Sequence, residues 1–417
     1  MERLKKLLLS QTIKDTLISF IGLGFSALVG FVYTVILARV LGPEQFGVFS
    51  AVVALVAIVY SLGDLGIASA LINFIPKLKD QRSILINTSF WFEVVVGFLI
   101  LIIFSILAIF HQNIVPGSLV NQLLIAGILA VNYLFIGYVQ GIFTAERRFL
   151  SYSFTQIIDA GVKIAIVFIL LYFSRLSIEM ALLANVISTI FSLIITFGKD
   201  FLSIKRSFDR GIFNKLYHFA KWIAVTRIFS VFISRIDIIL LNLLSSSFQA
   251  GIFAAANRIT LLFSLLVSSL GAVINPRFSG FDNKEKVISY IKKLLGLISL
   301  VSALMLVSAL FAEPIINLVF GDKFAAAIPV FQALTISMIP FIFSLATTPA
   351  LIYTFNQPRF VARMTAFQVI SMIILELILI PKYGSFAPPI ALGITNTIVL
   401  LVSGIKLFNL LTSREEK

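Results

Sequence analysis

The sequence predicts an all-α membrane protein with twelve transmembrane helices in two pseudo-symmetric six-helix bundles around a central cavity. Of its 417 residues, 59% are hydrophobic and 12% are charged, whereas soluble domains are about half apolar and about a quarter charged. The apolar stretches run for about 20 residues or more, enough to cross a bilayer as helices. Basic residues gather in alternate connections between these stretches, and the two halves of the chain resemble each other.

The apolar stretches define twelve predicted spans, whose edges hydropathy assigns to within about four residues. The predicted spans are 16–38, 46–75, 84–110, 118–143, 154–174, 178–198, 216–244, 248–276, 290–312, 325–356, 359–381 and 386–410. Several are longer than one crossing requires, so we expect them to tilt, to kink or to end in water.

Two predicted spans contain helix breakers. The second is interrupted by the Gly-Asp-Leu-Gly sequence at 63–66, and the tenth contains Pro329, Pro340 and Pro349. Broken helices are tolerated in membranes where they border a cavity or act as hinges. We therefore expect both spans to bend.

The distribution of basic residues fixes the predicted orientation. Of 33 lysines and arginines, 25 lie in the termini and the even-numbered connections, and 4 lie in the odd-numbered ones. Cytoplasmic loops carry such an excess, so both termini are predicted to be cytoplasmic and the protein to lie in the plasma or inner membrane. The net charge of +14 thus indicates orientation and contact with anionic membrane lipids, and no nucleic acid is predicted as a partner.

Metal, cofactor and catalytic sites are not predicted. The chain has no cysteine, which excludes a disulfide frame or a thiolate site. Its two histidines, His111 and His218, are far apart in the sequence, and a lone histidine is seldom a metal ligand.

The longest predicted inside loop divides the chain near its middle. We expect an N-terminal six-helix bundle in 1–198, a cytoplasmic linker in 199–215 and a C-terminal six-helix bundle in 216–417. The linker mixes basic residues with phenylalanines, which suits either a helix lying on the leaflet or a solvated connection.

The two predicted halves share a short repeat. The sequence at 47–51, Gly-Val-Phe-Ser-Ala, aligns with Gly-Ile-Phe-Ala-Ala at 251–255, an offset of 204 residues. Both copies begin the second span of their half, so the repeat is parallel. Parallel repeats are typical of transporters that work by alternating access around a site near the membrane midplane.

Nine ionisable residues of the predicted spans are candidates for positions inside the membrane. Each charge at the bilayer centre costs about 2.5–3.5 kcal/mol on insertion scales, so its presence indicates a cavity or a partner. These residues are Asp64, Glu93, Asp159, Lys163, Arg227, Arg235, Asp237, Arg258 and Glu376.

Arg227 and Arg258 are predicted at similar depths, about 15 Å into two neighbouring antiparallel spans. Two guanidinium groups repel each other unless an anion lies between them, and a pyrophosphate suits such a pair through bidentate hydrogen bonds. The alternative is that Asp237, Glu93 or Asp159 neutralises them. The residues predicted to contact a phosphate are Arg227, Arg258, Arg235 and Lys163.

The carboxylates have two possible roles. Asp159 and Lys163 are spaced i, i+4, which predicts an ion pair within one helix. The alternative is that Asp159 or Glu93 titrates or binds an ion. With Asp237 and Asp64, these two carboxylates are predicted to be charge partners or to couple transport to protons or sodium.

The string LARVLGPEQFGVFSAVVALVAIVYSLGDLGIASALINFIPK resembles the first helical hairpin of the polysaccharide-biosynthesis flippases. These share a superfamily with multidrug exporters and peptidoglycan-precursor flippases. The second half is similar to the matching family pattern at Arg235, Asp237, Gly251, Phe253, Ala255 and Arg258.

The resemblance implies a flippase for oligosaccharide repeat units linked to polyprenyl phosphate or pyrophosphate. Such a protein moves its lipid-linked oligosaccharide to the outer leaflet for O-antigen, capsule or exopolysaccharide assembly. It is not an enzyme, because no bond is broken. The polysaccharide polymerase machinery is an implied partner.

Two other functions compete with this one. A drug exporter of the same superfamily often carries a carboxylate in its first span, whereas here Asp15 lies only at the edge of that span. A membrane glycan-polymerising enzyme usually needs a sizeable aqueous loop with carboxylates or histidines, and the predicted outside loops are short.

Overall fold

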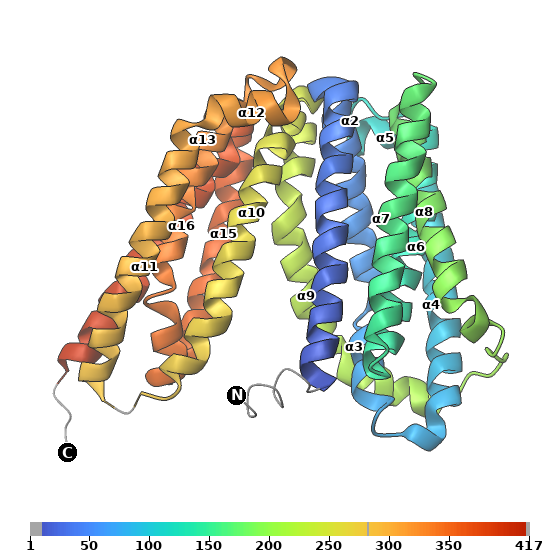
Figure 1. Cartoon of the computed structure of the whole chain (residues 1–417), viewed down its shortest axis with the longest axis horizontal. Coiled ribbons are helices and arrows are strands. Elements are labelled where there is room, and N and C mark those ends of the chain that lie inside the picture. The colour runs from blue at the N-terminus through green and yellow to red at the C-terminus, as the bar shows by residue number, and fades with distance from the viewer. Residues whose placement is uncertain (1–10, 282, 414–417) are drawn as a thin grey trace. The chain divides into compact units, whose positions relative to one another are not determined.

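The computed structural model of the chain describes residues 11–281 and 283–413, and every regular element in these ranges is helical (Figure 1). The first half holds α2 (Gln11–Asp64), α3 (Ile67–Phe74), η1 (Lys79–Gln81), α4 (Arg82–Ile109), α5 (His111–Ile114), α6 (Val120–Ala145), α7 (Phe149–Tyr172) and α8 (Ile178–Phe201). The second half holds α9 (Arg210–Leu244), α10 (Ser247–Phe278), α11 (Lys284–Leu310), α12 (Ala312–Phe320), η2 (Asp322–Phe324), α13 (Ala327–Ser337), α14 (Ile339–Ser344), η3 (Ala350–Thr354), α15 (Pro358–Tyr383), η4 (Gly384–Phe386) and α16 (Ala387–Thr412). The predicted all-helical fold is confirmed.

Helix α2 is two helical segments joined at one glycine. Gly42 has φ 74° and ψ 171°, outside the helical region, and Pro43 follows it. A positive φ favours glycine because it has no Cβ, and proline is well placed at the start of a helix. The division falls inside the predicted gap between the first two spans, 38 to 46.

Both predicted helix breaks are present. Helix α2 ends at Asp64 and α3 begins at Ile67, while Leu65 and Gly66 between them have φ values of 42° and 77°. The tenth predicted span is divided into α13, α14 and the π-helical η3. In both places the backbone leaves the regular α-helical hydrogen-bond pattern within an apolar stretch.

The described residues contain nine helical stretches long and apolar enough to cross a membrane. Two of them, Ile18–Asp64 with 47 residues and Pro358–Thr412 with 55, are each more than twice the length of about 20 that one crossing requires. The chain is therefore a multi-pass membrane protein. The count of twelve spans, the arrangement in two six-helix bundles and the orientation of the termini stay predictions.

The helices form two compact units. Unit 1 comprises Val48–Ile239 with the described residues up to Leu41, and unit 2 comprises Gly42–Gly47 with the described residues from Leu240 onward. Most of α9 thus packs with unit 1, although it follows the predicted linker. Residues 199–215 include the last turn of α8 and the start of α9, and the predicted domain boundaries at 198 and 216 stay predictions.

The core of unit 1 surrounds α6, which packs against α3, α4 and α8. Tyr138 of α6 is fully buried there, and its hydroxyl donates a hydrogen bond to the Ile86 carbonyl oxygen at 2.9 Å. Helix α9 joins this core through Ile212, Leu216 and Ala220. Their i, i+4 spacing places them on one helix face, which fixes the start of α9 against unit 1.

The core of unit 2 lies among α10, α11, the broken helices and α16. Two glycines allow two chain segments to approach closely there. A Cβ built on Gly47 would overlap the Ser247 carbonyl oxygen, and one built on Gly251 would overlap the Pro43 carbonyl oxygen. Each of these Cβ atoms would also lie close to the backbone nitrogen of the other glycine, at 2.8 Å and 3.0 Å, so the contact is reciprocal between Gly47 and Gly251, which are separated by the predicted repeat offset of 204 residues.

Candidate functional site

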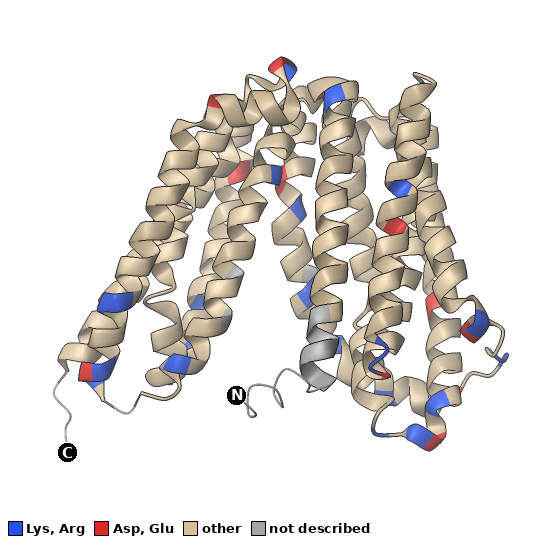
Figure 2. Cartoon of the chain, in the orientation of Figure 1, with Lys and Arg blue, Asp and Glu red and all other residues tan. Residues whose placement is uncertain are grey.

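Few charged residues lie along the middle of the helices, and most mark the places where helices end (Figure 2). Seven of the eight residues predicted at the site belong to unit 1, and Arg258 belongs to unit 2. The seven are Asp64, Glu93, Asp159, Lys163, Arg227, Arg235 and Asp237. Unit 1 contains two clusters of these side chains.

The first cluster forms where α2 breaks. Asp64 is the last residue of α2, and its Oδ1 accepts a hydrogen bond from the Ala68 backbone N–H at 3.5 Å. A Cβ at Gly66 would lie 2.7 Å from the Ala220 carbonyl oxygen of α9, so a glycine here permits the close approach of that helix. Arg227 follows Ala220 by about two helical turns. The break thus turns Asp64 toward Arg227.

Arg227 and Asp64 form an ion pair. The Nη1 of Arg227 donates a hydrogen bond to Oδ2 of Asp64 at 2.5 Å. The Asp64 side chain is 4% exposed and the Arg227 side chain is 38% exposed. The carboxylate is therefore enclosed, whereas more than a third of the Arg227 side chain is exposed.

Asp64 was predicted as a possible charge partner, but it was not one of the three carboxylates expected to neutralise Arg227. The depth of Asp64 within its predicted span could have indicated its pairing with Arg227. Both residues lie about eleven positions from the predicted inner ends of their spans, or about 16 Å along a helix. Opposite charges at equal depth on different helices are natural partners in a bilayer.

Glu93 of α4 is enclosed beside this pair. Its exposed fraction is 0%, and neither carboxylate oxygen has a hydrogen-bond partner among the described residues. It lies within electrostatic range of Asp64 and Arg227. Burying an ionised carboxylate without a partner is costly, so this position accommodates the neutral acid.

The second cluster joins α7 and α8. The Nζ of Lys163 donates to Oδ2 of Asp159 at 3.0 Å, which confirms the predicted i, i+4 ion pair. Ser188 donates a hydrogen bond to Oδ1 of Asp159 at 2.7 Å. The two charged side chains are 13% and 17% exposed. The carboxylate is thus satisfied from two helices.

Neighbouring polar residues extend this cluster across unit 1. The ammonium group of Lys163 lies 5.7 Å from the ring centroid of Tyr33, and the Tyr33 hydroxyl accepts a hydrogen bond from Asn185 at 2.5 Å. Asn132 donates to Thr189 at 2.9 Å. These residues were not among the predicted site residues. The sequence feature that could have indicated them is the set of polar residues Asn185, Ser188, Thr189 and Ser192, which helical spacing places along one side of α8.

The other predicted basic residues are partly buried. Arg235 and Asp237 are both intermediate in exposure, and Arg235 lies within electrostatic range of Tyr133, which is also intermediate in exposure, as do Lys163 and Asp159. Arg258 is also intermediate in exposure and lies in unit 2. A shared anion site for Arg227 and Arg258 stays a prediction, as do the phosphate and coupling roles of all eight residues.

No group of three or more histidine, cysteine, aspartate or glutamate side chains with metal-binding geometry occurs in the ranges that the structure describes. The polar clusters instead contain paired charges: Arg227 pairs with Asp64 in the first cluster, and Lys163 pairs with Asp159 in the second.

The family model described as "Polysaccharide biosynthesis protein" matches residues 36–329 of this chain. A Shigella flexneri protein provisionally named an O-antigen transporter is 23% identical over 409 residues, which cover 92% of this chain and 94% of the relative. A Haloferax volcanii protein named a probable low-salt glycan biosynthesis flippase, Agl15, is 25% identical over 399 residues, which cover 91% of this chain and 80% of the relative.

Solved structures of transporters share the fold. An inward-facing multidrug resistance transporter of the MATE family aligns with a TM-score of 0.72 and 17% identity, over 93% of this chain and 94% of that one. The lipid II flippase MurJ in an inward closed conformation aligns with a TM-score of 0.69 and 17% identity, over 95% of this chain and 90% of that one. At these identities the likeness establishes the helical transporter fold alone.

Proposed function

Because the chain belongs to the polysaccharide biosynthesis protein family, we propose that it flips lipid-linked oligosaccharides across the membrane. The substrate is an oligosaccharide repeat unit on a polyprenyl phosphate or pyrophosphate. It moves from the cytoplasmic to the outer leaflet for assembly of a surface polysaccharide. The relatives are named as transporters and flippases, which confirms the prediction that this chain is not an enzyme.

The observation that carries this proposal is the Arg227 side chain. It lies within α9 and is 38% exposed, although its carboxylate partner Asp64 is enclosed. A guanidinium group has five N–H donors, and the bond to Asp64 uses only Nη1. We assign the remaining donors to a substrate phosphate, with Asp64 holding the guanidinium group in position.

The other charged residues fit the same role. We propose that Lys163, Arg235 and Arg258 contact the phosphates at other stages of an alternating-access cycle. Asp159, Asp237 and Asp64 balance these charges when no substrate is bound, and a proton or sodium ion that couples transport would bind among these three carboxylates and Glu93.

The membrane potential favours the proposed direction. With the cell interior negative, each negative charge that moves outward across the whole field gains about 2.3 kcal/mol per 100 mV. The two charges of a pyrophosphate diester therefore gain about 4.6 kcal/mol per 100 mV. Outward movement of an anionic lipid thus needs less additional coupling than inward movement.

Deletion of the gene tests this function. We expect a lipid-linked glycan to accumulate on the inner leaflet, and the wild-type gene to restore its movement to the outer leaflet. A drug exporter would instead change the efflux of cationic dyes and leave the lipid-linked glycans unchanged. That second pattern would overturn the proposal.

A further inference from the structure

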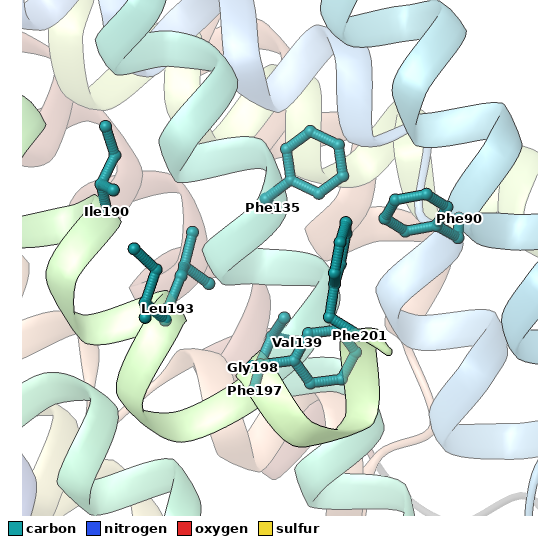
Figure 3. Close-up of a pocket in the computed structure, with 9 residues that line it drawn as sticks. Phe90, Phe135, Val139, Ile190, Leu193, Phe197, Gly198 and Phe201 are labelled. Carbon is teal, nitrogen blue, oxygen red and sulfur yellow. The ribbon is translucent and has the colours of Figure 1, made fainter. Parts of the chain in front are cut away.

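Unit 1 contains an apolar pocket between three helices. It has a volume of about 290 Å³, and α4, α6 and α8 line it (Figure 3). The lining residues are Phe90, Phe135, Val139, Ile190, Leu193, Ile194, Phe197, Gly198 and Phe201.

The size and chemistry of this pocket fit a hydrocarbon chain. The lining has almost no polar surface, and drug-sized ligands usually need a few placed polar groups in about 300–1,000 Å³. Ile194 is 64% exposed and Phe201 is 52% exposed, so the pocket is open along α8. A chain segment from the surrounding bilayer can therefore enter from the side.

A basic segment is held beside the pocket. Lys199 directly follows the lining Gly198. The Lys205 carbonyl oxygen accepts a hydrogen bond from Nε1 of Trp91 at 3.0 Å, and Trp91 is the neighbour of the lining Phe90. The rings of Phe90 and Phe201 lie 5.6 Å apart, edge to face. The connection after α8 thus folds back toward the wall of the pocket.

Hydrogen bonds to α4 fix this connection. Asn87 accepts a bond from the Lys205 backbone N–H at 3.1 Å and donates one to Ser207 at 3.0 Å. Thr88 accepts a bond from the Asp209 backbone N–H at 3.1 Å. Three side chains of α4, including Trp91, therefore hold a segment that has no regular structure of its own between Leu202 and Asp209.

The cations of the segment are available to a ligand. Lys199, Lys205 and Arg206 are exposed, and none of them forms an ion pair among the described residues. The acids nearby are already engaged: Asp200 pairs with Arg148 at 2.8 Å, and Asp209 accepts a hydrogen bond from the Ile212 backbone N–H at 2.7 Å. Positive charge thus predominates where the pocket ends.

We propose that this pocket and its basic segment bind an anionic phospholipid of the surrounding bilayer. One acyl chain occupies the pocket between α4, α6 and α8, and the head-group phosphate contacts Lys199, Lys205 and Arg206. The charge identifies the occupant, because a zwitterionic lipid or a detergent gains little from three cations. The bound lipid clamps the connection that leads into α9, the helix that carries Arg227.

Lipid binding to the purified full-length protein tests the head-group contacts. The probes are phosphatidylglycerol and phosphatidylcholine, titrated in nanodiscs or by native mass spectrometry. Each basic side chain near a membrane surface contributes roughly five-fold in affinity for anionic lipid. The variant K199Q/K205Q/R206Q should therefore bind phosphatidylglycerol on the order of 100-fold more weakly. Its phosphatidylcholine affinity should stay unchanged.

The matched control is K286Q/K292Q/K293Q, which removes three exposed lysines of unit 2 and should leave the tight phosphatidylglycerol site intact. An equal loss in both triple variants would mean general attraction to an anionic surface and would overturn the proposal. So would equal affinity of the wild type for the two lipids.

A second pair of variants tests the pocket. Ile194→Trp fills it from its open side, and the neighbouring Ile195→Trp, which is 54% exposed and outside the lining, is the control. Only Ile194→Trp should release phosphatidylglycerol. If neither variant loses phosphatidylglycerol binding, the pocket assignment is overturned. If a polyprenyl phosphate at equal concentration displaces the phospholipid, the site is assigned to the substrate instead.

Discussion

Asp64 and Arg227 lie 163 residues apart in the chain and form a hydrogen-bonded ion pair within unit 1. The pair depends on the break between α2 and α3, because an unbroken helix would continue past Asp64 with no close approach of α9 at Gly66. The helix break and the glycine thus bring Asp64 to the guanidinium group of Arg227 on α9.

Replacing Arg227 by Gln is expected to abolish flipping and to reduce stability. The loss of a charge-assisted hydrogen bond leaves the enclosed Asp64 without its partner, which costs about 1–3 kcal/mol. The double variant Asp64→Asn/Arg227→Gln should regain most of this stability and still not flip. Thermal unfolding in detergent measures the stability of each variant. An assay of lipid-linked glycan transport measures its flipping. Normal transport by the double variant would remove Arg227 from the substrate site.

Replacing Lys163 by Met separates charge balance from substrate contact. The single change leaves Asp159 with only the Ser188 hydroxyl and should cost about 3 kcal/mol, near the value for breaking a buried pair. Adding Asp159→Asn should restore stability to within about 1 kcal/mol. If Lys163 contacts phosphate, the restored double variant still transports slowly, and full transport would contradict that role.

Glu93→Gln should change stability by less than about 1.5 kcal/mol, because a neutral amide replaces a buried neutral acid of similar shape and volume. Glu93→Lys is the contrasting variant and should prevent folding, since it buries a cation in the same place. The free energy of unfolding in denaturant is the measurement. A large loss in the Gln variant would show that Glu93 is ionised in the folded protein.

Gly47→Ala and Gly251→Ala should destabilise the protein by similar amounts, about 1–3 kcal/mol or more, because each added methyl group meets a backbone carbonyl oxygen. Gly404→Ala is the matched control, since a Cβ there has no neighbour within 4 Å. Melting temperatures in detergent compare the three. Tolerance of alanine at only one of the two sites would contradict the reciprocal contact.

The sequence was sufficient for features that depend on local chemistry. Runs of apolar residues predict helices because a bilayer leaves the backbone no other partner, and the breaks at 63–66 and in the tenth span follow from glycine and proline. The Asp159–Lys163 pair follows from helical spacing alone. Each of these depends on residues close together in the chain.

Features that depend on tertiary packing were not predicted. The partner of Arg227 depends on how α9 lies against the end of α2, and Gly66 permits that approach only because the Ala220 carbonyl oxygen lies opposite. The division of the compact units near Ile239 likewise reflects the packing of Ile212, Leu216 and Ala220 on the core of unit 1. Hydropathy alone contains no information on which helices touch.

The most direct test of the central claim is a flipping assay with the purified protein in vesicles. A fluorescent oligosaccharide on polyprenyl pyrophosphate is placed in both leaflets, and a membrane-impermeant quencher reports how much of it becomes accessible over time. We predict rapid exchange with the wild-type protein and none above empty vesicles with the folded Asp64→Asn/Arg227→Gln variant. Equal rates for the two proteins would contradict the claim that Arg227 binds the substrate phosphate.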